Sequence, residues 1–177
     1  MKRRDIPVYA ILHFLDIVVA SVAARLFSNI VVKLVDLFVE LDFFSASLIR
    51  VITLFVFSFA LIIFLSYKNG YREARFDKVE SIASASAASL VHFLLGMPFT
   101  YSPWLFGATR HLAGFLAFGE NYNDASRIEA IPFGTLVAVA LVGAVLTVIA
   151  ITTANYVGFR HRLVHRQELT GDQNSET

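Results

Sequence analysis

Four long apolar runs alternate with polar segments along this chain of 177 residues. A helix that spans a membrane needs about 20 mostly apolar residues, because each residue adds about 1.5 Å and the hydrocarbon core is about 30 Å thick. Four runs meet this length: residues 6–27, 45–67, 79–97 and 131–158. Pro98 ends the third run, since the residue before a proline is disfavoured in a helix. The pattern therefore predicts an all-α, polytopic membrane protein with four transmembrane helices.

Two shorter segments have the pattern of helices that lie on a membrane surface. In residues 28–44, four polar residues recur at spacings of three and four, along one stripe of a helix: Asn29, Lys33, Asp36 and Glu40. Residues 107–118 are a second, weaker candidate. A fifth span at residues 28–44 would turn the basic loop and tail outward, so we expect one or two interfacial amphipathic helices on the outer side.

The distribution of charge predicts the orientation of the chain. Cytoplasmic segments of membrane proteins carry an excess of Lys and Arg. With both termini and the central loop inside, that side holds most of the 15 cations: Lys2, Arg3, Arg4, Lys68, Arg72, Arg75, Lys78, Arg160, Arg162 and Arg166. We therefore expect both termini on the cytoplasmic side, and we expect the protein in the cytoplasmic membrane of a bacterium. Residues 1–166 would form one membrane domain, and the polar residues 167–177 a disordered cytoplasmic tail.

The first run has a second interpretation as a cleavable signal peptide. It follows the basic start MKRRD, and the small residues ASVAA at 20–24 resemble a cleavage site. However, His13 and Asp16 are unusual in a signal core, and the run is longer than the ~7 to 15 residues of such cores. We therefore expect a membrane span.

Composition agrees with a membrane protein and excludes several classes of function. Hydrophobic residues make up 56% of the chain, with a mean hydropathy of +0.64, whereas soluble domains have about 45–50% apolar residues. A net charge of +1 argues against nucleic-acid binding. The absence of Cys excludes disulfides, thiolate metal sites and thiol nucleophiles.

Several polar side chains fall inside the predicted spans, where polarity is costly. Counting from Ile6 places Asp16 near the middle of the hydrocarbon core. An ionised Asp at that depth costs about 2.5 to 3.5 kcal/mol. The same count places polar residues of the other spans at similar depths in the membrane. The residues of this predicted intramembrane polar cluster are Tyr9, His13, Asp16, His92 and Thr147.

This cluster has two interpretations, which the sequence leaves open. Intramembrane ionisable groups usually mark the path of an ion, a proton or a polar solute. Alternatively, the side chains form hydrogen bonds between helices and have a structural role only. Gly134 with Ala138, at the start of the fourth span, has the spacing that lets helices approach closely, either within the chain or against a partner chain.

The charged segment YKNGYREARFDKVE, residues 67–80, joins the second and third spans. If residues 71–80 are helical, their cations and acids project to nearly opposite sides. The basic side would lie on anionic headgroups, at about 1 kcal/mol per cation, and the acidic side would meet a partner. The alternative is a solvated connector. The residues of this predicted lipid-facing or docking loop are Arg72, Glu73, Arg75, Asp77, Lys78 and Glu80.

Motifs for catalysis are incomplete. The sequence has no HExxH zinc helix, no GxSxG elbow and no P-loop glycine pattern. His161 and His165 are spaced like metal ligands, but the neighbouring Arg residues would repel a cation, so we expect no metal, no cofactor and no catalytic residue. We therefore expect a non-catalytic subunit or accessory partner of a membrane complex, bound to another membrane protein or to further copies of itself. The alternative is a small transport component that binds a polar solute or a proton near Asp16 and His92.

Overall fold

The computed structural model describes residues 6–73, 75–96, 103–119 and 131–175. Within these ranges the chain is all-α and contains no strand, as the apolar pattern predicted. Five helices follow one another: α1 (Ile6–Asp36), α2 (Phe43–Arg72), α3 (Lys78–Gly96), α4 (Pro103–Phe118) and α6 (Phe133–Ser175).

Three of these helices, α1, α2 and α6, are long and apolar enough to cross a membrane. The chain is therefore a helical protein with candidate membrane spans, as expected. The expected span at residues 79–97 corresponds to α3, which has 19 residues and is not among these candidates. Its sequence is less apolar because it begins with charged residues and contains several hydroxyls, which are Ser81, Ser84, Ser86 and Ser89.

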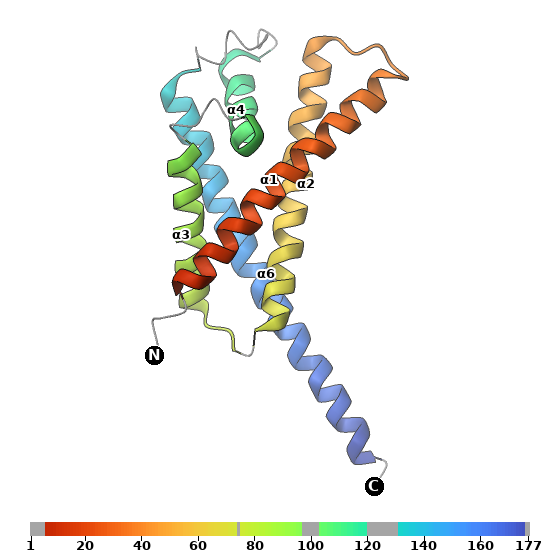
Figure 1. Cartoon of the computed structure of the whole chain (residues 1–177), viewed down its shortest axis with the longest axis vertical. Helices are drawn as coiled ribbons and strands as arrows, with labels where there is room; N and C mark the ends of the chain where they lie inside the picture. The colour runs from red at the N-terminus through yellow and green to blue at the C-terminus, as the bar shows by residue number, and fades with distance from the viewer. Residues whose placement is uncertain (1–5, 74, 97–102, 120–130, 176–177) are drawn as a thin grey trace.

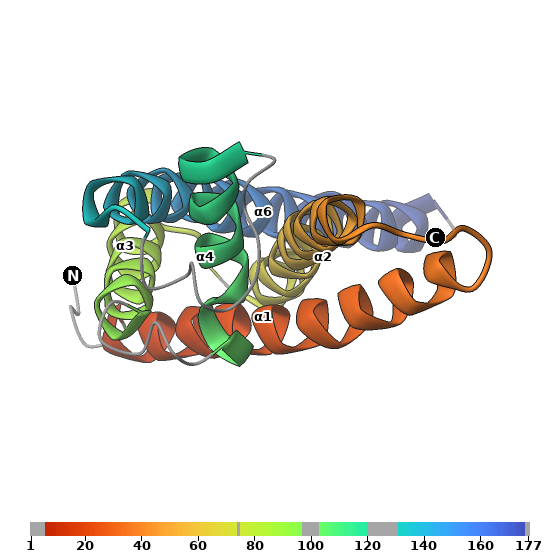
Figure 2. The ribbon, with the colours of Figure 1, turned by 90° about the horizontal axis from the view of Figure 1, so that it is seen from above.

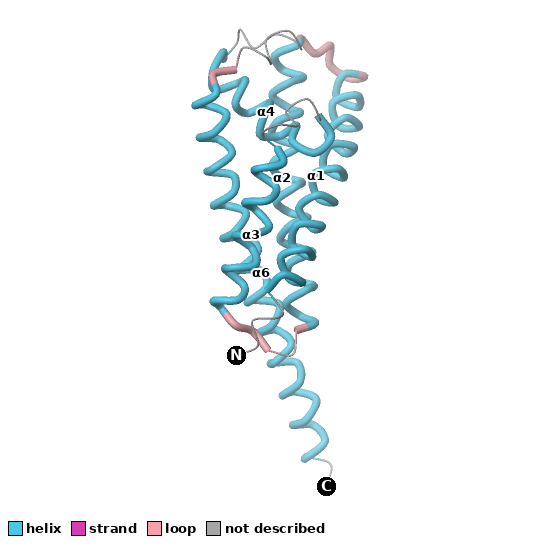
Figure 3. Tube along the Cα trace, turned by 60° about the vertical axis from the view of Figure 1, so that its left-hand side comes forward, coloured by secondary structure: helices cyan, strands magenta, loops and turns pink. Residues whose placement is uncertain are grey.

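Four helices, α1, α2, α3 and α6, run along the length of the molecule, while α4 lies across one end (Figures 1 and 2). α1 crosses the bundle diagonally (Figure 1). We call the end where α2 leads into α3 the α2–α3 end, and it also holds the start of α1. α6 begins at the opposite end, passes the α2–α3 end and continues beyond the bundle (Figures 1 and 3).

The predicted surface helix at residues 28–44 does not form a separate element. α1 continues without a break to Asp36, and Ser28 is fully buried in the bundle. No Gly or Pro separates the two segments, so a single helix satisfies the backbone groups of both. α2 begins only after Asp42, whose carboxylate accepts a hydrogen bond from the Ser45 backbone N–H at 3.1 Å. This N-cap is what restarts the helix.

The predicted helix at residues 107–118 is present as α4, and it begins earlier, at Pro103. Proline favours the first turn of a helix, because its φ angle is already helical and the missing N–H has no intrahelical partner there. α4 packs on the bundle at the end opposite the α2–α3 end. His111 Nε2 lies 3.1 Å from Arg25 Nη1 of α1, and the ring of Phe115 lies 5.4 Å from that of Phe44 in α2.

The last helix is longer than the pattern predicted. α6 has 43 residues and extends to Ser175, so it includes most of the tail for which the polar sequence predicted disorder. The polar composition of the tail was the basis for predicting disorder. Composition does not show that the tail follows a long helix directly, without a residue that would end the helix. Extending a helix that has already nucleated costs little, since each further residue adds one backbone hydrogen bond.

The centre of the bundle is apolar and joins four helices. The buried residues of this core cluster are Ile17, Ala20, Ile62, Ala85, Ala88 and Ile151. Small Ala side chains on α1 and α3 let the helices pack closely. Many large apolar side chains instead point outward from α1, α2 and α6. An apolar exterior around an apolar core is what a helical bundle in lipid requires.

Two glycines bring α2 and α6 into backbone contact. A Cβ added at Gly70 would lie closer than 3.0 Å to the Asn155 carbonyl oxygen, and one at Gly158 closer than 3.0 Å to the Tyr67 carbonyl oxygen. A Cβ added at Gly134 would meet nothing within 4 Å. Among the described glycines, Gly70 and Gly158 therefore allow close helix packing within the chain, whereas packing of Gly134 against a partner chain stays a prediction.

Candidate functional site

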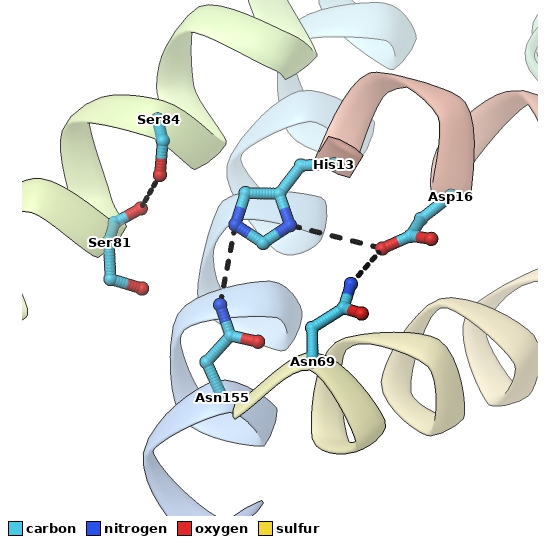
Figure 4. A network of polar contacts seen from close by, with 6 residues as sticks. All are labelled: His13, Asp16, Asn69, Ser81, Ser84 and Asn155. Carbon is cyan, nitrogen blue, oxygen red and sulfur yellow. Dashed lines mark hydrogen bonds and ion pairs between the residues drawn. The ribbon is translucent and has the colours of Figure 1, made fainter. Parts of the chain in front are cut away.

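Four polar side chains connect α1, α2 and α6 near the α2–α3 end (Figure 4). The Asn69 amide of α2 donates a hydrogen bond to Asp16 Oδ2 of α1 at 2.7 Å. Asn155 Nδ2 of α6 lies 3.3 Å from His13 Nε2, and His13 Nδ1 lies 3.9 Å from Asp16 Oδ2. We call His13, Asp16, Asn69 and Asn155 the polar network. It holds the first helix to two others.

The interior of the polar network is shielded from solvent. His13 and Asn155 are each 1% exposed, whereas the Asp16 side chain is 17% exposed. An amide NH₂ can only donate, so its contact with Nε2 favours the His13 tautomer that carries its proton on Nδ1. That N–H faces the Asp16 carboxylate. His13 Nδ1 and Asn155 Oδ1 are both buried without a hydrogen-bond partner among the described residues.

The polar network lies near the end of α2. Asn69 is less than one turn from Arg72, the last residue of α2, which is about 4.5 Å along the helix axis. Asp16 lies beside Asn69. Counting from Ile6 placed Asp16 at mid-membrane depth, whereas its partner Asn69 lies close to the end of α2, so this depth stays a prediction. α1 crosses the bundle diagonally (Figure 1), and the path along a tilted helix is longer than its depth.

Serine side chains of α3 face the same region (Figure 4). Ser84 Oγ donates to the Ser81 carbonyl oxygen of its own helix at 3.1 Å. Further buried hydroxyls without a hydrogen-bond partner among the described residues belong to Ser66, Ser81, Ser89 and Thr152. Ser66 and Thr152 lie about one turn from Asn69 and Asn155. Buried polar groups therefore extend over all four lengthwise helices.

The apolar core limits how far these polar groups continue. Ile17 follows His13 by one turn on α1, and Ile151 precedes Asn155 by one turn on α6. Both belong to the buried core cluster, together with Ile62 of α2. Within the described part of the chain, apolar side chains therefore lie next to the polar network, alongside the buried hydroxyls of Ser89 and Thr152.

The residues of the predicted intramembrane cluster lie on three helices, α1, α3 and α6. His13 and Asp16 are close, and Tyr9 lies one turn before His13 on α1. The His92 ring packs edge-on against Phe14, with ring centres 6.4 Å apart. Thr147 Oγ1 donates to the Gly143 carbonyl oxygen of its own helix at 2.8 Å. Residue counting gave these groups similar levels, but it does not show which faces meet.

Sequence reasoning missed the two asparagines of the polar network. Asn155 had a detectable signal, because it is a polar residue inside an apolar run. Asn69 precedes a glycine at the end of the second run, where a loop was the simpler interpretation. No family model, curated protein or solved structure matches this chain. Its function therefore has to be inferred from its own contacts.

The segment between α2 and α3 is held against α6. The Arg162 guanidinium of α6 donates to the Arg72 carbonyl oxygen at 2.8 Å and also to the Glu73 carbonyl oxygen. The last carbonyls of a helix have no intrahelical donors, so Arg162 caps the end of α2. The Phe76 ring packs on Tyr156 and Phe159 of α6, with ring centres 5.4 and 6.0 Å apart.

Residues 71–80 do not form the two-sided helix considered from the sequence. α2 ends at Arg72, Glu73 has extended dihedrals, and α3 begins at Lys78. The Asp77 carboxylate accepts hydrogen bonds from the backbone N–H groups of Val79 and Glu80, at 2.9 and 3.2 Å. Asp at this position with Glu three residues later is the pattern of a capping box. That signal predicts a helix start at residue 78.

The acidic residues of this segment are engaged within the molecule. Glu80 is 12% exposed and pairs with Arg75 at 3.7 Å, and Asp77 caps α3. Glu73 is half-buried. Burial, together with the smaller effect of the nearby negative charge of Glu80, raises the pKa of the Glu73 carboxyl to about 7. The expected acidic docking side, directed away from the bundle, is therefore not formed by these side chains.

Replacing Glu73 with Gln is expected to reduce the pH dependence of stability. The native state binds the Glu73 proton up to about pH 7, whereas the unfolded chain releases it near its usual pKa of 4.5. The free energy of unfolding therefore falls as the pH rises between these values. Solvent screens this half-buried group, so we expect Glu73→Gln to add about 1 kcal/mol above pH 7.

The measurement is the melting temperature of both proteins in detergent at acidic and at mildly alkaline pH. Glu40→Gln, which changes an exposed acid at the opposite end, is the control and should leave the pH profile unchanged. If the melting temperatures of the wild type and of Glu73→Gln changed with pH in parallel, the raised pKa of Glu73 would be contradicted.

Proposed function

We propose that this protein is a small, non-catalytic integral membrane protein that acts as a subunit or accessory partner in a membrane complex. The observation that carries this proposal is the end of α6. This helix has 43 residues, or about 65 Å, and it continues alone beyond the α2–α3 end (Figure 3). This part of the helix extends past the rest of the bundle and gains little from packing on it. Binding to another membrane protein would supply that packing.

The apolar core next to the polar network favours this proposal over the transport alternative. A transport component that used Asp16 and His92 would need polar groups to continue between them. Ile17, Ala85 and Ala88 are buried in the core cluster next to the polar network. Such a core favours a structural role for the polar network, in which hydrogen bonds hold helices together.

We infer that α3 is a fourth membrane span. α2 ends at the α2–α3 end and α6 begins at the opposite end, so the chain has to return along the bundle between them (Figure 1). Of the described segments between α2 and α6, α3 is the one that runs lengthwise. Its Ala85 and Ala88 are buried against protein, and a span that packs mainly on protein tolerates small and hydroxyl residues.

Four spans place both termini on one side of the membrane. The α2–α3 end carries the exposed cations Lys68, Arg72 and Arg160. Because cytoplasmic segments are enriched in Lys and Arg, we propose that the α2–α3 end faces the cytoplasm. The part of α6 beyond the α2–α3 end would then meet its partner on the cytoplasmic side.

Crosslinking from α6 tests the accessory role. The chain contains no Cys, so single-cysteine variants can carry a photocrosslinker at one defined position. The two test variants are Val164→Cys and Gln167→Cys, at exposed positions of α6 beyond the α2–α3 end. The control is Val19→Cys, at an exposed position of α1. We expect one dominant adduct in native membranes, containing the same polypeptide from both α6 positions and absent from the control. No adduct, or unrelated adducts from the two positions, would contradict the proposal.

A further inference from the structure

Three exposed cations lie at a similar level near the α2–α3 end. Lys68 and Arg72 are four residues apart on α2, so they lie on one face of that helix. Arg160 lies at the same level of the bundle on α6, two residues after Gly158, which touches the backbone of α2 near Tyr67, and it therefore points away from α2. All three side chains are exposed, and none has an acidic partner among the described residues. We call Lys68, Arg72 and Arg160 the basic surface.

Aromatic residues mark the same level of the bundle. Tyr67 and Tyr71 of α2 pack around His161 of α6, with ring centres 6.1 and 6.0 Å from the imidazole. Tyr156, on the next turn of α6, is exposed. Tyr side chains are enriched where a membrane meets water, because the ring is apolar and the hydroxyl is wet. The basic surface therefore lies at the expected depth of lipid headgroups.

Among the described residues near this level, the acidic side chains are hydrogen-bonded, paired or half-buried. Asp16 accepts a hydrogen bond from Asn69, Asp77 caps α3, and Glu80 pairs with Arg75. Glu73 is half-buried. Although cations and acids are mixed along the sequence here, the folded chain directs the cations outward. The exposed side chains Lys68, Arg72 and Arg160 therefore present positive charge, which attracts anions.

The Lys68 ammonium lies over an apolar ring. Its Nζ is 5.6 Å from the centre of the Phe64 ring, and Phe64 is exposed one turn earlier on α2. An anion that binds beside Lys68 therefore meets an apolar surface as well as a charge. A free phosphate gains nothing from that surface, whereas a phospholipid places its acyl chains there. This combination favours a lipid.

We propose that the basic surface binds the headgroup phosphates of anionic phospholipids, with Phe64 against their acyl chains. The binding is electrostatic and partly hydrophobic, so it discriminates phosphatidylglycerol from zwitterionic phosphatidylcholine. Each cation near an anionic membrane surface contributes about 1 kcal/mol, or roughly a fivefold gain in affinity. Loss of all three charges should therefore weaken the preference at least about tenfold.

The test measures which lipids remain bound to the protein. The full-length chain is reconstituted into liposomes of phosphatidylcholine mixed with phosphatidylglycerol, extracted in a mild detergent, and its retained lipids are quantified by mass spectrometry. The wild type is compared with the triple variant Lys68→Gln, Arg72→Gln, Arg160→Gln. Lys33→Gln, an exposed cation on the last turns of α1, is the matched control. A charge-preserving variant, Arg72→Lys with Arg160→Lys, separates loss of charge from loss of fold.

We expect the wild type, the Lys33 control and the charge-preserving variant to enrich phosphatidylglycerol, and the triple variant to lose this enrichment. The enrichment should also fall with added salt, since salt screens exposed charges. Equal enrichment in the wild type and the triple variant would overturn the proposal. Complete displacement of phosphatidylglycerol by inorganic phosphate at matched ionic strength would overturn it as well, because it would indicate a phosphate site without lipid contacts.

Discussion

Replacing Gly158 with Ala is expected to force α6 away from α2 and to destabilise the bundle by about 3 kcal/mol. The added Cβ would lie closer than 3.0 Å to the Tyr67 carbonyl oxygen and to the Tyr71 backbone nitrogen. Backbone atoms cannot rotate away as the end of a flexible side chain does. The helices must separate, and contacts along their whole interface weaken. For a chain of this length, such a loss corresponds to a decrease of about 6 to 12 °C in melting temperature.

Gly70→Ala should have a similar effect, because its Cβ would meet the backbone of Asn155. Gly143→Ala and Gly134→Ala are the matched controls, since a Cβ at either position meets nothing within 4 Å. Ala is a better helix former than Gly by about 1 kcal/mol, so the controls should be neutral or slightly more stable. Equal melting temperatures for Gly158→Ala and Gly143→Ala would contradict the close approach of α2 and α6.

Replacing Asn69 with Leu is expected to destabilise the protein by about 2 kcal/mol. Asn69 donates the 2.7 Å hydrogen bond to Asp16, whose side chain is only 17% exposed. Leu has a similar volume but no donor, so the carboxylate would lose its partner from α2. A poorly solvated acceptor without a donor costs more than the hydrogen bond itself contributes.

A double-mutant cycle isolates this interaction from changes in packing. Asp16→Leu removes the acceptor, and the double variant Asp16→Leu, Asn69→Leu leaves no unpaired polar group at this contact. We therefore expect the double variant to be more stable than the sum of the single effects predicts, by about 1 kcal/mol. The melting temperatures of the wild type, the two single variants and the double variant in detergent give the coupling free energy between Asp16 and Asn69. Strictly additive effects would show that Asp16 and Asn69 do not interact.

The apolar pattern was sufficient to predict the long helices and the membrane class. It placed the ends of the second and third helices within a few residues, because Pro98 and the charged segment at 67–80 punctuate the chain. It failed at residues 28–44, where a polar stripe continues an apolar helix instead of starting a new one. A stripe shows which face of a helix is polar, but not where the helix begins.

The polar network was harder to predict because it depends on how helices cross. His13 and Asp16 were identified correctly as neighbours on one face of α1. Their partners, Asn69 and Asn155, depend on the diagonal path of α1 and on the close contact of α6 with Gly70. Neither the crossing angle nor this register is encoded in residue counts along a single helix. The asparagine inside the fourth apolar run was nevertheless a usable signal.

The number and direction of the spans are tested most directly by the labelling of single cysteines with a membrane-impermeant maleimide. The three positions are Lys78→Cys at the start of α3, Phe133→Cys at the start of α6, and Gln167→Cys in the part of α6 beyond the α2–α3 end. The chain contains no Cys, so each label reports one site. Four spans with both termini inside predict that Phe133→Cys is labelled in intact cells, and that Lys78→Cys and Gln167→Cys are labelled only in inside-out vesicles. Labelling of Lys78→Cys and Phe133→Cys from one side and of Gln167→Cys from the other would show three spans and contradict the account.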